Sequence, residues 1–370
     1  MKVVTVKNRK QLRQFITFPE TLYQKSENWV PPMHFDEINS LTDKNPAFDF
    51  CESEYYMVVD DDGKVLGRVA AIMNHNANQK WNEKIARFGW IDFVEDKEVL
   101  RLLMDAVTRW ALERGATCLK GPLGFTDMDK EGLLVEGFEN LAPITCIYNF
   151  PYYGPMLEEL GFSKDVDWTQ RVLEVPEEVP PMMQYVDLIQ KRFKLKIFYP
   201  RNNKDLREKG LQTFHVLNDS FAPLYEFTKL TDKQINCYLD QYLPLVNKDF
   251  LCLILNENDD VVGFCMCIPF LAKAFQQAKG KLFPFGFIPI LKSMRHNDTL
   301  EALMIGVLPE YQGKGVSVLI FKYMLDNCKK YGIKKLLMNP QLENNTKVQM
   351  LFDDFVVHPY MRRRSYTKQL

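Results

Sequence analysis

The alternation of apolar and polar residues predicts three strands and a helix in the first third of the chain. Residues 54–59 and 64–72 are rich in β-forming side chains, and a run of Asp and Gly separates them, which indicates a hairpin. Residues 86–93 predict a third strand. Apolar residues then recur at helical spacing over 98–114, and a further strand is expected over 116–121.

The same order of elements recurs in the second half of the chain. Strands are predicted over 250–255, 261–268 and 300–307, with a helix over 315–331 and another strand over 333–338. A period of roughly 200 residues is too long for a solenoid, so the repeat indicates two duplicated domains.

A proline-bearing segment, Val175–Pro181, is the predicted domain boundary, because proline continues neither a helix nor a central strand. Residues 1–180 are therefore expected to form one domain and residues 190–370 the other. The second copy also contains extra sequence over 271–298. Within it, residues 282–291 are apolar and aromatic and are flanked by basic residues.

This extra sequence has two interpretations. It could be a lid that packs over a cleft, or it could line or present a membrane-facing surface for a long acyl chain or a lipid amine. The second interpretation implies peripheral membrane contact through residues 282–291.

Composition narrows the class of protein. Hydrophobic residues make up 46% of the chain, charged residues 26%, and the formal net charge is -1, which argues against nucleic acid as a partner. The eight cysteines are scattered, and Cys265 and Cys267 have no second ligand pair nearby, so we expect reduced thiols and no metal site. The absence of a secretory signal or of an apolar run that could span a bilayer favours a cytoplasmic protein.

The most informative segment joins the strand over 300–307 to the helix that follows it. Residues Gln312–Ser317 form a glycine-bearing loop directly before that helix. The unpaired N–H groups and partial positive charge of a helix N-terminus can bind a diphosphate. Gly313 and Gly315 allow the backbone to approach the phosphates closely. The loop lacks both the P-loop spacing and the Gly-x-Gly-x-x-Gly pattern, so a nucleotide hydrolase or dinucleotide fold is disfavoured.

This segment resembles the signature of the GNAT superfamily of N-acetyltransferases, which is Gln/Arg-x-x-Gly-x-Gly/Ala after a Val-x-Pro strand end. Val307, Pro309, Gln312 and Gly315 match the signature, while Ser317 stands where Gly or Ala is usual. The resemblance implies an α/β (α+β) fold of two tandem GNAT-like domains. Each domain would be a twisted mixed sheet with flanking helices and splayed central strands.

In the second domain, the resemblance implies that the strands over 300–307 and 333–338 admit the pantetheine arm of acetyl-CoA or a longer acyl-CoA. Backbone groups of the first strand would bind the arm, and loop amides would hold the diphosphate. The residues that the resemblance places at the coenzyme are Ile305, Gly306, Val307, Gln312, Gly313, Lys314, Gly315, Val316, Ser317 and Asn345.

The first domain resembles the same superfamily through its Tyr148–Phe162 segment but lacks the phosphate loop. Two acids stand where the glycines would be, and the charges of Asp92, Glu95 and Asp96 would repel a diphosphate. The first domain is therefore interpreted as a degenerate copy that shapes the acceptor site or the domain interface.

Acyl transfer to an amine needs a base, an oxyanion site and a proton for the leaving thiolate. The resemblance assigns the oxyanion to backbone N–H groups near Gly306 and Val307, and it makes Glu301 the candidate base. Glu301 could equally be a solvated acid at a strand end. The usual acid is a Tyr seven residues after Asn345, where this chain has Phe352.

Three explanations of Phe352 stay open: Tyr360 or Tyr366 substitutes, the thiolate leaves unassisted, or acyl-CoA binds without turnover. The predicted function is an acyl-CoA-dependent N-acyltransferase that moves an acetyl or longer acyl group to an amine of a small molecule or lipid. A looser resemblance to bacterial sphingoid-base N-acyltransferases favours a long-chain donor. The alternative is a catalytically silent acyl-CoA-binding or regulatory protein.

The run Met361–Lys368 is rich in arginine and could be taken for a nucleic-acid surface. As a terminal strand with period two, it would divide its arginines between two faces. A solvated edge or a contact with an acidic group is therefore favoured over DNA binding.

Overall fold

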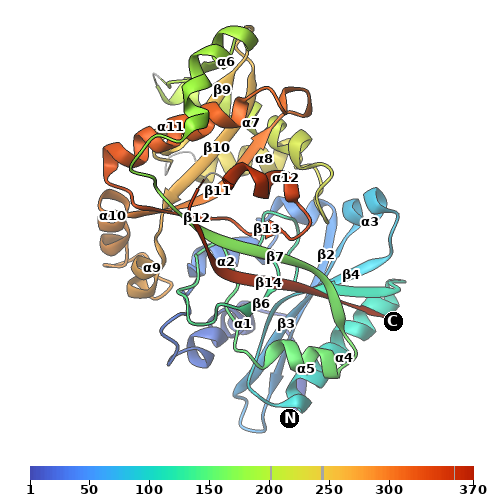
Figure 1. Ribbon diagram of the computed structural model, residues 1–370. Helices are drawn as coiled ribbons and strands as arrows, with labels where there is room; N and C mark the ends of the chain where they lie inside the picture. Colours follow the sequence, from blue (N-terminus) through green and yellow to red (C-terminus); the bar gives the residue numbers. More distant parts are fainter. Residues whose placement is uncertain (201, 243–245, 354) are drawn as a thin grey trace. The chain divides into compact units, whose positions relative to one another are not determined.

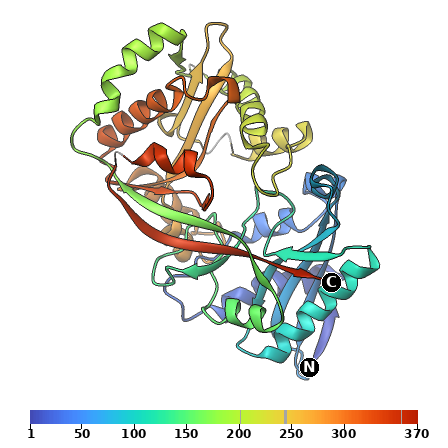
Figure 2. The same cartoon turned by 45° about the vertical axis from the view of Figure 1, so that its right-hand side comes forward.

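The computed structural model describes residues 1–200, 202–242, 246–353 and 355–370 (Figures 1 and 2). These residues form two compact units. The first unit comprises Met1–Thr169, Leu271–Leu291 and Tyr360–Leu370, and the second comprises Gln170–Phe270 and Lys292–Pro359. The unit boundaries fall inside two long strands, β7 (Ser163–Glu174) and β14 (Val357–Gln369), inside helix α10 (Phe287–Arg295), and between Phe270 and Leu271.

These units do not follow the predicted ranges of 1–180 and 190–370, because segments distant in sequence pack with the first unit. The side-chain amide of Gln276 donates to the backbone carbonyls of Glu27 and Trp29, at 2.8 and 2.9 Å. At the C-terminus, β14 pairs with the strand that ends at Gly121, opposite Tyr366. Composition alone gives no sign of these contacts.

The first unit is a mixed sheet in the order β1-β2-β3-β4-β5-β14, with β6 also paired to β14. Strands β4 and β5 are parallel, and the other described pairs are antiparallel. Besides β7, α10 and β14, the elements are β1 (Lys2–Thr5), α1 (Arg9–Leu22), α2 (His34–Ser40), β2 (Cys51–Val59), β3 (Val65–Asn74), α3 (His75–Trp81), β4 (Ile85–Phe93), α4 (Lys97–Glu113), β5 (Cys118–Gly121), β6 (Leu133–Glu136), α5 (Tyr153–Glu159) and α9 (Ala272–Ala278).

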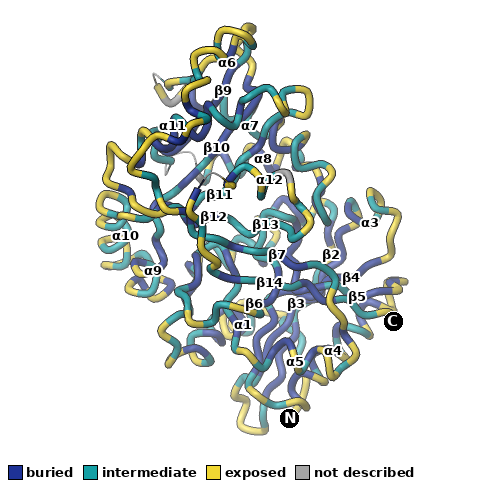
Figure 3. The backbone as a smooth tube through the Cα atoms, in the orientation of Figure 1, coloured by how far each residue is buried: buried dark blue, intermediate teal, exposed yellow. Residues whose placement is uncertain are grey.

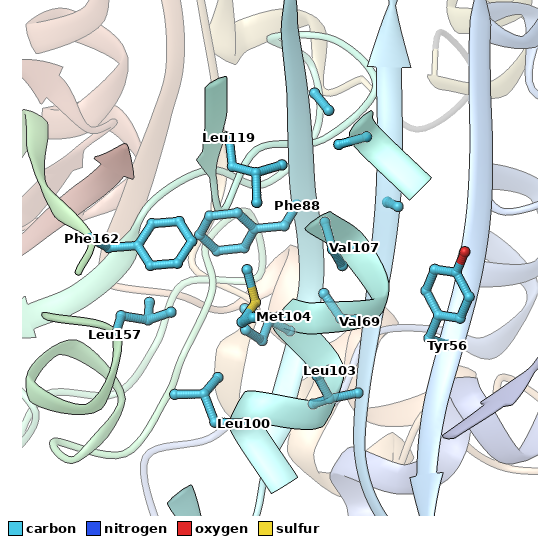
Figure 4. Close-up of a cluster of buried hydrophobic side chains, with 14 of the residues drawn as sticks. Tyr56, Val69, Phe88, Leu100, Leu103, Met104, Val107, Leu119, Leu157 and Phe162 are labelled. Carbon is cyan, nitrogen blue, oxygen red and sulfur yellow. The ribbon is translucent and has the colours of Figure 1, made fainter. Parts of the chain in front are cut away.

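Strand β3 is buried on both faces (Figure 3). Val69 and Ala71 belong to a core on the side of α4, whereas Ala70 and Ile72 belong to a second core on the side of α1. The alternation follows from the two-residue period of a strand. Figure 4 shows the first of these cores, where Leu103 of α4 lies beside Val69.

The second unit is a mixed sheet in the order β7-β12-β11-β10-β9-β8. Helices α6 and α11 cover one face, and α7 packs on β10 and β11 at the other (Figures 1 and 2). Its remaining elements are α6 (Val186–Phe193), β8 (Lys196–Ile197), α7 (Asn203–Phe221), α8 (Asp232–Tyr242), β9 (Leu251–Leu255), β10 (Val261–Pro269), β11 (Thr299–Val307), α11 (Val316–Tyr331), β12 (Lys335–Met338), β13 (Gln341–Leu342) and α12 (Thr346–Gln349).

The predicted strands and helices are present in both units, and the extra sequence over 271–298 contains helices α9 and α10. For the arginine-rich run, the structure decides between the two alternatives. Strand β14 lies between β5 and β7 in the sheet, so it is not a solvated edge. Arg362 and Arg364 both bind the buried carboxylate of Asp167, and Arg363 donates to the carbonyl of Ile147.

Asp167 is the acidic contact of this run, and its side chain is fully buried. It lies 2.7 Å from Arg362 Nε, 2.8 Å from Arg364 Nε and 3.3 Å from Lys164 Nζ. Burial opposes ionisation, but hydrogen bonds from Arg364 and Arg362 outweigh it and lower the pKa of the Asp167 carboxyl. A lowered folded-state pKa stabilises the fold above the unfolded pKa of about 3.9, and this stability is lost as pH falls through the folded value.

We predict that Asp167→Asn lowers the free energy of unfolding by about 1–3 kcal/mol at pH 7, because three partly exposed cations lose their shared anion. Urea unfolding of variant and wild type should show this difference shrinking below about pH 4. The control Glu159→Gln removes an exposed pair with Lys97 and should cost less than about 1 kcal/mol. A difference for Asp167→Asn that did not change with pH would contradict the electrostatic explanation.

Candidate functional site

Strand β11 leaves its parallel neighbour part-way along its length. Pairing with β12 covers Thr299–Ala302 and Lys335–Met338 only. On the other side, β10 continues along β11 with one irregularity: Met304 and Ala302 oppose consecutive residues of β10, so Leu303 is an extra residue. A bulge of this kind bends and twists a strand. From Leu303 to Val307, β10 is the one strand paired with β11 among the described residues, in agreement with the predicted splay.

The two faces of β11 have different surroundings. Leu300 and Ala302 belong to the core beneath α11, so Glu301 faces the opposite side of the sheet. Gly306 also faces that side, where α7 approaches so closely that a Cβ on Gly306 would lie 2.7 Å from the Ser220 hydroxyl oxygen. Sequence reasoning missed Ser220, because nothing in a helical pattern indicates which strand a serine will face.

The loop after β11 is shaped by two glycines with positive φ. Gly313 has φ 73° and Gly315, which precedes the first residue of α11, has φ 78°. Other residues adopt this region at a cost of about 1 kcal/mol, which accounts for both glycines. No atom lies within 4 Å of a Cβ built on Gly313, whereas one on Gly315 would lie 2.7 Å from Ile189 of α6. The sequence analysis did not predict α6.

Four backbone N–H groups at this helix end have no acceptor among the described residues. They belong to Gly313, Gly315, Val316 and Ser317, whereas the N–H groups of the next two residues donate to the carbonyl of Gly315. A helix N-terminus also carries a partial positive charge, so these four N–H donors are suited to bind an anion. The Lys314 ammonium lies 4.9 Å from the Tyr311 ring centroid in the same loop.

The other predicted coenzyme residues hold the local structure together. The side-chain amide of Gln312 donates to the carbonyl of Val307 at 3.2 Å, which ties the loop to the strand end. Asn345 precedes α12, and its side chain accepts the N–H of Val348 at 3.4 Å. Seven residues further on, Phe352 is buried against Phe321, with ring centroids 5.5 Å apart, and it supplies no hydroxyl.

The two predicted catalytic residues belong to different units. Glu301 is 1% exposed on β11 of the second unit, so the expectation of a solvated acid is wrong. Tyr360 lies in the first unit, where its hydroxyl donates to the Leu141 carbonyl at 2.6 Å. Tyr366, the other tyrosine considered, donates to Glu158 at 3.3 Å. Because Glu301 belongs to one unit and both tyrosines to the other, neither unit by itself contains both the candidate base and a candidate acid.

The equivalent region of the first unit satisfies its own hydrogen bonds. Strands β4 and β5 pair in parallel from Ile85 to Arg87 on β4 and then separate. Near the end of β4, the Phe93 N–H donates to the Tyr153 hydroxyl at 3.1 Å, and the Tyr152 hydroxyl donates to the Phe93 carbonyl at 2.5 Å. The side chain of Asp96 caps α4 by accepting the Glu98 N–H at 2.8 Å. Side chains thus satisfy both backbone groups of Phe93 and cap α4, whereas α11 has no side-chain cap.

Asp92 has a different role from the predicted repulsion of a diphosphate. Its carboxylate is buried and pairs with Arg68 at 2.8 Å. The Tyr23 hydroxyl donates to the same carboxylate at 2.6 Å. Burial raises the pKa of Asp92, while Arg68 and Tyr23 act in the opposite direction. The charge of Asp92 is therefore compensated inside the core rather than presented to a ligand.

The described residues contain no group of three or more His, Cys, Asp or Glu side chains that could hold a metal ion. None of their helices is both long and apolar enough to cross a membrane. The eight cysteines are free thiols, and burial raises the pKa of Cys328 to about 12, which disfavours a thiolate nucleophile.

Comparison with known proteins agrees with this geometry. Residues 213–355 match the family model of the acetyltransferase (GNAT) family. Over its whole length the chain is 26% identical to the protein YghO of Escherichia coli strain K12, covering 95% of that protein. It is 24% identical to a bacterial ceramide synthase of Caulobacter vibrioides, again over its whole length and 98% of that protein.

Two solved structures share the fold. A tandem GNAT protein from the clavulanic acid biosynthesis pathway superposes with a TM-score of 0.56 at 12% identity, over all of this chain and 98% of that one. A glucosamine N-acetyltransferase region of a fungal multi-domain β-N-acetylglucosaminidase gives a TM-score of 0.54 at 14% identity, over 99% of this chain and 38% of that one. Residues 213–355 therefore match the acetyltransferase (GNAT) family, and the chain as a whole shares the fold of a tandem GNAT protein.

Proposed function

We propose that the second unit binds acyl-CoA and transfers the acyl group to an amine. The observation that carries this proposal is the continuity of two open backbone regions, the unpaired edge of β11 and the free N–H groups after Gly313. The pantetheine arm would pair with Ile305 and Val307 as an added strand. The diphosphate would accept the N–H groups of the loop and of the first turn of α11.

The remaining loop residues support the same binding mode. Gly306 keeps side-chain atoms away from the face shared with Ser220, and Gln312 holds the strand end to the loop. Lys314 adds a positive charge near the diphosphate. Asn345 is the N-terminal cap of helix α12, which follows β12 and β13 in the chain. The donor is acetyl-CoA or a longer acyl-CoA.

The catalytic step forms a bond between the amine nitrogen and the thioester carbonyl carbon and breaks the carbon–sulfur bond. We assign the amine proton to Glu301, whose carboxyl is buried on the strand that carries the open edge. Backbone N–H groups near Gly306 and Val307 would stabilise the oxyanion. The departing thiolate takes a proton from water or from a side chain.

The source of that last proton is the weakest part of the site. Phe352 stands where the resemblance to the GNAT superfamily places a tyrosine, and it is packed in the core. Tyr360 stays a prediction, and acting as the acid would require its hydroxyl to release the Leu141 carbonyl. This arrangement favours one second candidate function, a protein that binds acyl-CoA without turning it over.

For the acceptor, we propose a long-chain amine such as a sphingoid base, with a long acyl chain on the donor. The support is similarity along the whole chain to a protein named bacterial ceramide synthase. We extend the proposal to a cytoplasmic location with peripheral membrane contact through residues 282–291, because long-chain amines reside in bilayers.

We predict that Ser317→Glu weakens coenzyme A binding by about 10- to 100-fold, because the new carboxylate would lie beside the diphosphate. The same change should preserve the fold, since an acidic residue in a first helical turn is favourable. Isothermal titration calorimetry with coenzyme A measures the effect, and Ser317→Gln is the matched control. Equal affinities for the Glu and Gln variants would exclude this loop as the diphosphate site.

We predict that Glu301→Gln lowers kcat by about 10²- to 10⁴-fold while the Kd for acyl-CoA stays unchanged. The assay follows free thiol from acetyl-CoA and palmitoyl-CoA with an amine panel that includes a sphingoid base. Glu257→Gln, at the exposed ion pair with Lys194, is the control and should retain full activity. Wild-type protein that bound coenzyme A but released no thiol with any amine would favour the silent binding protein.

A further inference from the structure

The extra segment of the second copy combines charge and exposure in a way that the acyl-transfer site does not use. No acidic residue occurs between Asp260 and Asp298, although Asp and Glu together number 48 in the chain. The cations of this interval are Lys273, Lys279, Lys281, Lys292 and Arg295. A stretch this long with one sign of charge creates a local positive field in a chain of net charge -1.

Large apolar side chains are exposed in the middle of this interval. Phe283 is 78% exposed and Phe285 72%, and Ile288 and Leu291 of α10 are about half exposed. The rings of Phe283 and Phe287 lie with centroids 6.0 Å apart, and these exposed apolar side chains all fall within the nine residues 283–291. A single exposed phenylalanine is unremarkable, but a contiguous apolar patch with a polar rim marks an interaction surface.

The base of the patch is held firmly by the first unit. Gln276 donates to two backbone carbonyls near Trp29, and the His34 N–H donates to the Gly280 carbonyl at 2.9 Å. Gly280 has φ 71°, and a Cβ there would lie 2.7 Å from the His34 ring. The turn that follows is closed by a hydrogen bond from the Phe287 N–H to the Leu282 carbonyl at 2.9 Å. The exposed rings are thus presented by an ordered scaffold.

We propose that residues 271–291 dock this protein on the surface of a bilayer that contains anionic phospholipid. Phenylalanine rings partition into the interfacial region, and each buried ring contributes about 1.5–3 kcal/mol. Each nearby lysine adds about 1 kcal/mol against anionic lipid. A protein partner fits less well, because the cores of protein interfaces are depleted of lysine and no acidic residue is interspersed here.

This inference deepens the proposed function, since docking would bring the second unit to substrates dissolved in the membrane. It names the docking surface and its lipid partner. It rests on the proposed function only for the idea that docking brings the second unit to its substrates. Vesicle binding itself needs neither acyl-CoA nor an acceptor, so the docking can fail while the proposed acyl transfer stands, and acyl transfer can fail while the docking stands.

The test is cosedimentation of the full chain with vesicles of phosphatidylcholine alone or of phosphatidylcholine with 30 mol% phosphatidylglycerol. We expect roughly tenfold stronger binding to the anionic vesicles, weakening as salt is raised. Phe283→Ser/Phe285→Ser should weaken binding by at least roughly tenfold. Leu188→Ser/Tyr199→Ser removes two comparably exposed apolar side chains, 60% and 65% exposed, and should bind as wild type.

Three results would overturn the docking proposal. The first is that the wild-type protein does not bind anionic vesicles. The second is that the Phe283→Ser/Phe285→Ser variant binds them as well as the wild type does. The third is that this variant has a different oligomeric state, measured by light scattering, while its vesicle binding is unchanged. The last result would assign the patch to a second copy of this chain. Thiol release from palmitoyl-CoA in detergent micelles is measured in parallel, and its absence counts against the proposed function while leaving the docking result to stand by itself.

Discussion

The structure of the candidate site depends on one constraint: backbone N–H and C=O groups of a strand that has left its neighbour must find other partners. Strand β11 separates from β12 after Ala302, and the bulge at Leu303 turns it away. What remains is an edge with the hydrogen-bonding pattern of a strand but no strand beside it. An extended ligand with amide groups can complete this edge without any dedicated side chain, which explains why the binding residues share little chemical character.

The two units meet the same constraint in opposite ways. In the first unit, Tyr152 and Tyr153 use their hydroxyls to satisfy both backbone groups of Phe93, and Asp96 caps the helix that follows. In the second unit, helix α11 has no side-chain cap, and the Val307 carbonyl accepts one side-chain hydrogen bond, from Gln312. The two units therefore share an architecture but satisfy these backbone groups to different extents, and the family model matches residues 213–355, which include the uncapped end of α11.

The chemistry of the site is less complete than its binding geometry. Glu301 is buried on the face of β11 that α7 covers, which suits a base working in a sheltered position. Phe352, by contrast, contributes to a core with Phe321 and Phe355, so its side chain is committed to packing. The proton for the thiolate must come from elsewhere. Both an enzyme and a binding protein would bind coenzyme A, but only an enzyme needs this proton, so thiol release distinguishes the two better than affinity does.

Local periodicity was enough to predict the hairpin and central strands of each unit and helices α4 and α11, and the loop with Gly313 and Gly315 follows from backbone conformations that few residues tolerate. Helices α1, α6, α7 and α8 were not predicted. Only the tertiary structure decided that Asp167 is the partner of Arg362, that Ser220 meets Gly306, and that residues 271–291 pack with the first unit. An arginine can pair with any of several acids, and a helix can turn any serine toward a strand. Such choices are fixed by packing between segments far apart in the chain, and a local pattern carries no record of them.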